Sequence, residues 1–127
     1  MNFCPKAELV PLDMEYRRGV HQKFINLKKA FPLYLASAGQ GLYRAQVMLA
    51  FCYEYGLGTE VELDKARAMF KLAGQSEKGH GKAEEHLAML EVNEENYDEA
   101  LRWFKEAQSK GNRTVKSYIW YLEKKLN

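Results

Sequence analysis

Residues 96–111 have the sequence NYDEALRWFKEAQSKG, in which apolar side chains return every three or four positions. This spacing places the apolar side chains on one face of a helix. They are Tyr97, Ala100, Leu101, Phe104 and Ala107. Gly111 then follows, and glycine is common just after the last residue of a helix. The stretch therefore predicts an amphipathic helix over residues 96–109.

The same arrangement occurs twice upstream, so the chain contains an internal repeat. Three alanines are 36 and 34 residues apart, and three glycines are 38 and 32 residues apart. The alanines are Ala30, Ala66 and Ala100, and the glycines are Gly41, Gly79 and Gly111. Periods of this length without strand patterns are typical of repeats that contain two helices and two turns.

The periodicity predicts about seven helices. They span residues of about 8–18, 24–38, 42–55, 62–75, 82–92, 96–109 and 113–125, and Gly19 would cap the first. Pro32 lies inside the second, which therefore either begins near Ala30 or kinks there. Gly56 and Gly58 turn the chain after the third helix. A phosphate-binding loop is the disfavoured alternative, because no strand precedes these glycines and no lysine follows in the right place.

Two segments match each other in register. The first is Ala45-x-x-x-Leu49-Ala50-x-x-Tyr53-x-x-Gly56-x-Gly58 followed by Asp64-Lys65-Ala66-x-x-Met69-Phe70-x-x-Ala73. The second is Ala83-x-x-x-Leu87-Ala88 followed by Tyr97-Asp98-Glu99-Ala100-x-x-Trp103-Phe104-Lys105-Glu106-Ala107-x-x-x-Gly111. This pattern resembles the Sel-one-like repeat, a relative of the tetratricopeptide repeat, over roughly residues 12–125. The second segment lacks the Gly-x-Gly loop and is closer to a tetratricopeptide repeat.

The resemblance implies an all-α, right-handed superhelix (solenoid) of antiparallel helical hairpins in a single domain. Its parts would be a degenerate repeat at about 8–41, repeats at about 42–79 and 80–111, and a C-terminal capping helix at about 112–126. Small residues would allow close helix contact, and large residues would fill the facing grooves. The small ones are Ala45, Ala66, Ala73, Ala83, Ala100 and Ala107, and the large ones are Leu49, Tyr53, Phe70, Leu87 and Phe104.

Charge is segregated along the chain despite a net charge of only +2. Residues 84–99 contain seven acids and no lysine or arginine, whereas residues 17–29 contain five lysines or arginines and no acid. Such a dipolar surface can orient a charged partner, although solvated helix faces are the simpler interpretation. A second basic stretch follows Gly111 and contains Arg113, Lys116, Lys124 and Lys125. Because the acidic block divides the two basic stretches, we do not expect nucleic-acid binding.

No pattern of catalytic or metal-binding residues is present in the sequence. His21, His80 and His86 lack the spacing of a zinc helix, and His80 occupies a turn position that Asn112 fills one repeat later. The glutamates at 84, 85, 91, 94 and 95 are expected to form a solvated face rather than a catalytic pair. We therefore expect no enzymatic activity, no catalytic residue, no metal, no cofactor and no small-molecule substrate.

The compartment is predicted from cysteines and hydropathy. Cys4 and Cys52 are too few and too far apart for a disulfide framework or a metal site. No apolar run approaches the roughly 20 residues of a membrane helix, and the N-terminus lacks the pattern of a signal peptide. We expect a cytoplasmic protein that does not bind membranes.

The resemblance also implies a concave surface lined by the first helix of each repeat. The residues expected to line it and bind a partner are Arg17, Arg18, Arg44, Val47, Phe51, Glu54, Tyr55, Glu85, Met89 and Tyr121. Ser117 and Lys124 would accompany Tyr121 on the last helix. On this concave surface, an exposed apolar strip rimmed by charge would be formed by Phe51, Tyr55, Met89 and Tyr121. Such strips are found at binding hot spots. Alternatively, these side chains pack against a neighbouring helix.

Three functions are compatible with this pattern. The first is a non-enzymatic adaptor or scaffold that binds a protein or peptide on its concave face. The second is a small immunity or inhibitor protein that neutralises a cognate toxin or enzyme. A hydrolase is the weakest alternative, because no nucleophile motif is assembled in the sequence.

Overall fold

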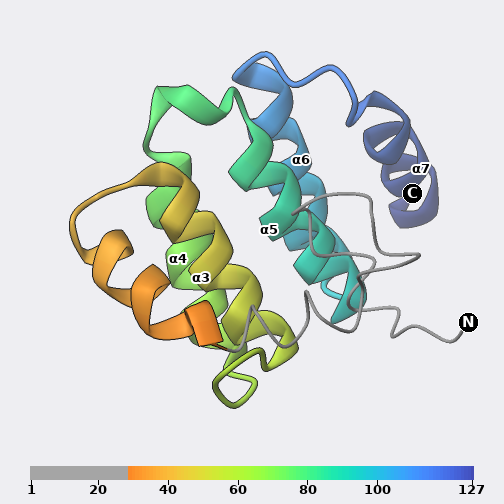
Figure 1. Cartoon of the computed structure of the whole chain (residues 1–127). Coiled ribbons are helices and arrows are strands. Elements are labelled where there is room, and N and C mark those ends of the chain that lie inside the picture. The colour runs from red at the N-terminus through yellow and green to blue at the C-terminus, as the bar shows by residue number, and fades with distance from the viewer. Residues whose placement is uncertain (1–28) are drawn as a thin grey trace, which may run out of the picture. The chain divides into compact units, whose positions relative to one another are not determined.

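The computed structural model describes residues 29–127, and all regular secondary structure within them is helical. Residues 29–39 form one helical segment. It is followed by α3 (Tyr43–Tyr55), α4 (Leu63–Gly74), the short 3-10 helix η1 (Glu77–Gly79), α5 (Lys82–Asn93), α6 (Tyr97–Ser109) and α7 (Lys116–Leu126) (Figure 1). The predicted all-α class is confirmed. The helix predicted at 8–18 and its cap at Gly19 lie outside the described residues.

Among residues 29–127 the helix bounds follow the predicted ones closely, and the largest difference is at the start of α7. This helix begins at Lys116 rather than at 113. The preceding residues form a turn instead, in which the Thr114 N–H donates to the Asn112 side-chain oxygen at 3.0 Å. Pro32 lies within the helical segment 29–39. The predicted start of the second helix, near residue 24, lies outside the described residues.

The chain divides into two compact units, residues 1–66 and residues 67–127. In the first, Cys52 and Leu57 are fully buried. The side chains packed against these two are Phe31, Tyr34, Met48 and Tyr55. Phe31 also meets Tyr53 edge to face, with 5.7 Å between ring centroids. This core is therefore built by α3, the helical segment 29–39 and the loop after α3.

The Gly-x-Gly loop after α3 has a structural role. Gly56 takes a left-handed conformation with φ 72°, and its N–H donates to the carbonyl of Cys52. A β-carbon at this position would lie 3.0 Å from the Val61 side chain. Leu57 then enters the core. Glycine is thus needed both for the backbone angle and for the close approach of the returning chain.

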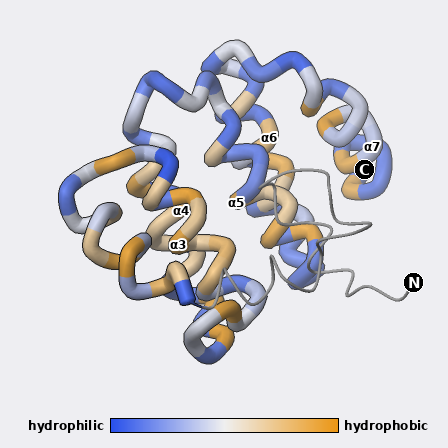
Figure 2. Tube along the Cα trace, viewed as in Figure 1, coloured by the Kyte–Doolittle hydropathy of each residue, from blue (hydrophilic) through white to orange (hydrophobic). Residues whose placement is uncertain are grey.

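In the second unit, α5 contacts α6 and α6 contacts α7. Their common core consists of Ala88, Ala100, Phe104, Ala107, Val115, Ile119 and Leu122. Phe104 stacks on Tyr118 with 5.0 Å between ring centroids. Hydrophobic and hydrophilic positions alternate within the turns of α6 and α7 (Figure 2), which is the pattern of helices buried along one side.

The small and large residues of the repeat pattern are buried as predicted. All six alanines and all five large residues named for helix packing are at most 9% exposed. Alanine at these positions lets helix backbones approach, and the larger side chains fill the remaining space at the density of a protein interior. The residues that recur in the repeat are therefore those that pack the helices together.

Candidate functional site

The predicted binding residues of α3 divide into exposed and buried ones. Arg44 is exposed, but Val47 and Phe51 are buried, with exposures of 8% and 4%. The expectation that Phe51 contributes to an exposed apolar strip is therefore wrong. The reason is that α3 is buried around most of its circumference: eight of its 13 residues are buried.

Glu54 and Tyr55 are half-buried. The ring of Tyr55 stacks on Phe51, with 6.2 Å between centroids and 8° between planes, and also packs against the Cys52 and Leu57 core. Burial raises the pKa of the Tyr55 hydroxyl, and the Glu54 carboxylate adds to the rise. Tyr55 thus completes the core of the first unit.

The predicted binding residues of the second unit also differ in exposure. Tyr121 is 58% exposed, whereas Met89 is partly buried against the α5–α6–α7 core. The carboxylate of Glu85 accepts hydrogen bonds from Asn112 at 2.9 Å and from Lys82 at 3.3 Å. Glu85 therefore holds the turn before α7. Arg17 and Arg18 lie outside the described residues.

The acidic block is only partly a solvated face. Glu94 and Glu95 are exposed, but Glu84 and Glu91 are 4% and 5% exposed, so the expectation is wrong for these two. Burial opposes ionisation of Glu91, yet hydrogen bonds from Arg67 and Asn96 outweigh it and lower the pKa of this carboxyl. Both carboxylates have a structural role, because each forms an ion pair with a basic side chain of its own.

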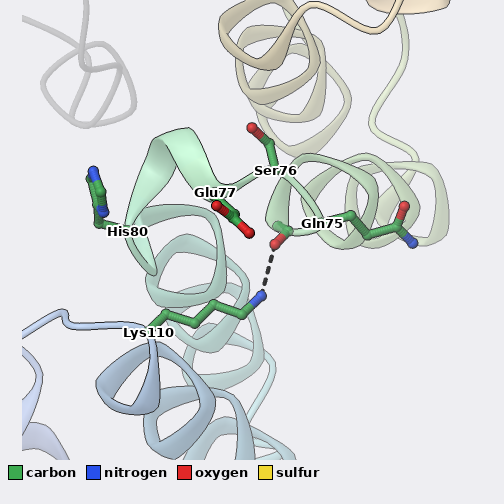
Figure 3. Close-up of a pocket in the computed structure, with 6 residues that line it drawn as sticks. Gln75, Ser76, Glu77, His80 and Lys110 are labelled. Atoms are coloured by element: carbon green, nitrogen blue, oxygen red, sulfur yellow. Dashed lines mark hydrogen bonds between the residues drawn. The ribbon is translucent and has the colours of Figure 1, made fainter.

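Lys110 is the partner of Glu84. Its ammonium donates to the Glu84 carboxylate at 2.5 Å. It also donates to the carbonyl of Gly74, the last residue of α4, at 2.7 Å (Figure 3). A hollow of about 460 Å³ lies beside this contact, lined by Gly74, Gln75, Ser76, Glu77, His80 and Lys110. The Lys110 ammonium in the wall of this hollow already donates hydrogen bonds to two protein oxygens. Lys110 therefore has a structural role, because it caps the C-terminal end of α4.

The two histidines in the described residues are separate from each other. His80 is exposed and takes a left-handed conformation with φ 48° in the turn before α5. The ring of His86 packs against Phe70 at 5.8 Å, and burial lowers the pKa of His86 to about 4. Within residues 29–127 no three histidine, cysteine or acidic side chains are grouped as a metal site requires.

Asn112 has a structural role in the turn before α7. Its side-chain amide donates to the Gly81 carbonyl at 3.3 Å and to Glu85, while its oxygen accepts from Thr114. The side chain is buried, with 7% exposure. Asn112 thereby ties the turn before α7 to the start of α5.

The largest exposed aromatic side chains of the second unit lie on α7. Trp120 is 62% exposed, Tyr121 58% and Tyr118 41%. Val115, Ile119 and Leu122 face the core instead. Helical spacing puts Trp120 and Tyr121 on the opposite side, together with Ser117 and Lys124. We call these last four residues the outer face of α7.

The outer face of α7 borders a shallow depression. Its lining consists of Arg113, Thr114, Lys116, Ser117 and Trp120. The ammonium of Lys124 lies 5.7 Å from the centre of the Trp120 ring, within the range of a cation–π contact. Sequence reasoning selected Tyr121, Ser117 and Lys124 but missed Trp120. Its position three residues after Ser117 and four before Lys124 would have placed it on the same face.

Comparisons of the chain with protein-family models, with curated proteins and with solved structures found no match. Among residues 29–127, no helix combines the length and apolar character needed to span a bilayer.

Proposed function

We propose that this chain is a non-enzymatic module that binds another protein. The observation that carries the proposal is the pair of neighbouring aromatic side chains, Trp120 and Tyr121, on the outer face of α7. The opposite side of the helix already supplies its core contacts through Val115, Ile119 and Leu122. The two exposed rings are thus not needed to attach α7, and tryptophan and tyrosine are the residues most enriched at binding hot spots.

The proposal includes a Sel-one-like solenoid architecture and a cytoplasmic location. The in-register alanines and glycines of the sequence support the first. A buried, unpaired thiol at Cys52 supports the second, because free cysteines persist in reducing compartments. The proposed binding surface differs from the one predicted from the sequence. It omits Val47 and Phe51, which are buried, and it adds Trp120 beside Tyr121.

Affinity capture tests the proposal. The wild-type chain would be compared with Trp120→Ser/Tyr121→Ser, using lysate of the source organism and protein identification by mass spectrometry. A matched control is Leu33→Ser/Leu35→Ser, which changes two exposed side chains of the first unit (69% and 47% exposed). Circular dichroism would confirm that every variant folds.

We expect a protein that the wild type and the control retain and the α7 variant loses. Capture of one dominant partner would point to an inhibitor, and several weaker partners would point to an adaptor. Equal capture by all three chains would show that the outer face of α7 is not the binding surface. Failure to capture any protein above background would contradict the protein-binding function.

A further inference from the structure

The cations around Trp120 indicate the chemistry of the partner. Arg113 and Lys116 line the depression beside the ring, and Lys124 lies over it. We propose that the outer face of α7 binds an acidic segment of a partner protein, in which carboxylates flank an apolar side chain that packs on Trp120. This inference rests on the protein-binding function proposed above and names the class of partner.

The positive charge on the outer face of α7 and in the adjoining depression is not neutralised within the described residues. No carboxylate of residues 29–127 forms a salt bridge with Arg113, Lys116 or Lys124. Glu123 is the one acid of α7, and it pairs with Lys105 of α6 at 3.1 Å. The three cations are therefore available to carboxylates from outside.

Lys125 differs from these cations because it lies over another ring. Its ammonium is 4.9 Å from the centre of the Tyr97 ring, at the start of α6. This contact and the Lys105–Glu123 pair both join α7 to α6. The charges of α7 thus divide into those that hold the helix in place and those that surround Trp120.

The same charges disfavour a symmetric contact between two copies. In a two-fold dimer the same patch meets itself, so Lys116 and Lys124 of one copy would face those of the other. Like charges at short range repel, and an apolar dimer interface would have to overcome that repulsion. An acidic segment that packs on Trp120 would instead be attracted by the same lysines.

A nucleic acid is disfavoured by the rest of the second unit. Glu94, Glu95, Asp98 and Glu99 are exposed at the turn before α6 and in its first turn. Nucleic-acid binding depends on many phosphate contacts along an extended basic surface. A short acidic peptide segment needs only the local face around Trp120.

Selection from a displayed library of random 12-residue peptides tests this inference. The immobilised chains would be the wild type, Trp120→Ala and the charge-reversed Lys116→Glu/Lys124→Glu variant. We expect the wild type to enrich peptides that carry several aspartates or glutamates around an apolar residue. Their affinity should fall at least about tenfold in Trp120→Ala, as for a hot-spot aromatic. The charge-reversed variant should lose the acidic preference.

Direct contact with Trp120 can be measured in a Trp103→Phe chain. The sequence has two tryptophans, so Trp120 becomes the only one and its emission reports on this face. A selected acidic peptide should shift the emission saturably, and the apparent Kd should weaken as salt is raised. The same peptide with lysine in place of each acid should cause no shift.

Each alternative has a distinct result. Enriched peptides that bind wild type and Trp120→Ala equally would overturn this inference and leave the protein-binding function standing. Concentration-dependent self-association in sedimentation, lost in Trp120→Ala, would assign the face to a second copy. Tighter Trp120-dependent binding of a 20-base oligonucleotide or of phosphatidylserine vesicles would overturn both proposals. A library that yields no enriched peptide would overturn this inference alone, since the lysate capture tests the protein-binding function separately.

Discussion

Arg67 and Glu91 form a two-point ion pair. The Arg67 Nε donates to one carboxylate oxygen at 2.8 Å, and Nη2 donates to the other at 3.2 Å. Asn96 donates to the same carboxylate at 2.9 Å. The pair joins α4 to α5, and Asn96 adds the turn before α6. One buried carboxylate therefore ties α4, α5 and the turn before α6 together.

Substitution Glu91→Ala should destabilise the protein strongly. We expect the free energy of unfolding to fall by about 2–4 kcal/mol, because two charge-assisted hydrogen bonds and the Asn96 bond are lost from a buried site. Urea denaturation followed by circular dichroism would measure the change. Glu99→Ala is the matched control: its partner Arg102 lies at 2.7 Å, but both side chains are at least half exposed.

The control should lose less than about 0.5 kcal/mol, as exposed ion pairs do. The pH dependence gives a second check. Because the pKa of Glu91 is lowered by folding, its stabilisation is present above the unfolded-state pKa near 4.5 and is lost as pH falls below it. Equal effects of Glu91→Ala and Glu99→Ala would contradict the structural role of the pair.

Gly81 and Gly111 provide a second comparison. Both have positive φ, 86° and 100°. A β-carbon at Gly81 would lie 2.5 Å from the carbonyl oxygen of Ala107 in α6, whereas nothing lies within 4 Å of one at Gly111. Gly111→Ala should therefore cost about 1–2 kcal/mol of backbone strain. Gly81→Ala should cost about 1–3 kcal/mol more, since α5 must move away from α6.

Thermal and urea unfolding of the two variants would test this difference. Both substitutions add one methyl group at a left-handed turn, so they differ mainly in the backbone contact. A Gly81→Ala variant as stable as Gly111→Ala would show that the α5–α6 approach is not limited by this glycine.

The helices were predictable because their determinants are local. The alanine and glycine anchors repeat at helical and turn positions within each segment, so periodicity alone placed Ala100, Phe104 and Gly111 correctly. The start of α7 was harder to predict from the sequence. It depends on the Asn112 side chain, which bonds to Gly81, 31 residues earlier.

The buried acids were not predictable from the same pattern. Glu84 and Glu91 resemble their exposed neighbours in sequence, and their partners Lys110 and Arg67 are 26 and 24 residues away. Acidic residues are rarely buried unless they are paired, and the pairing is set by the tertiary fold. Phe51 was misplaced for a related reason: α3 is apolar on several sides, so its helical spacing does not define one outward face.

His86 should make the fold sensitive to acid. Burial lowers its pKa to about 4 from the usual 6.5. Between these values the unfolded chain binds a proton that the folded chain does not, so stability falls as pH drops from 6.5 toward 4. The expected loss is about 2–3 kcal/mol, and His86→Gln should reduce the slope in this range. The matched control is His80→Gln, which changes an exposed histidine.

Urea denaturation at several pH values from 4 to 8 would measure both slopes. The neighbouring charges act in opposite directions: Glu85 raises the pKa of His86, and Lys82 lowers it. Burial is the largest cause, so the slope should persist at high salt. A wild-type slope that His86→Gln leaves unchanged would assign the acid sensitivity to carboxylates instead.

The Cys52 thiol should be protected from reagents in the folded protein. It is fully buried, and burial raises its pKa to about 11. The thiolate is the reactive form, so both access and ionisation are reduced. The test chain is Cys4→Ser, in which Cys52 is the only thiol. The control is Ser117→Cys/Cys52→Ala/Cys4→Ser, in which the only thiol is on the outer face of α7. At pH 8 the thiol of the test chain should react with an aromatic disulfide reagent at least about 100-fold more slowly than the thiol of the control. Guanidinium chloride should abolish the difference, since unfolding exposes both thiols. Similar rates in the folded chains would show that the core around Cys52 opens readily.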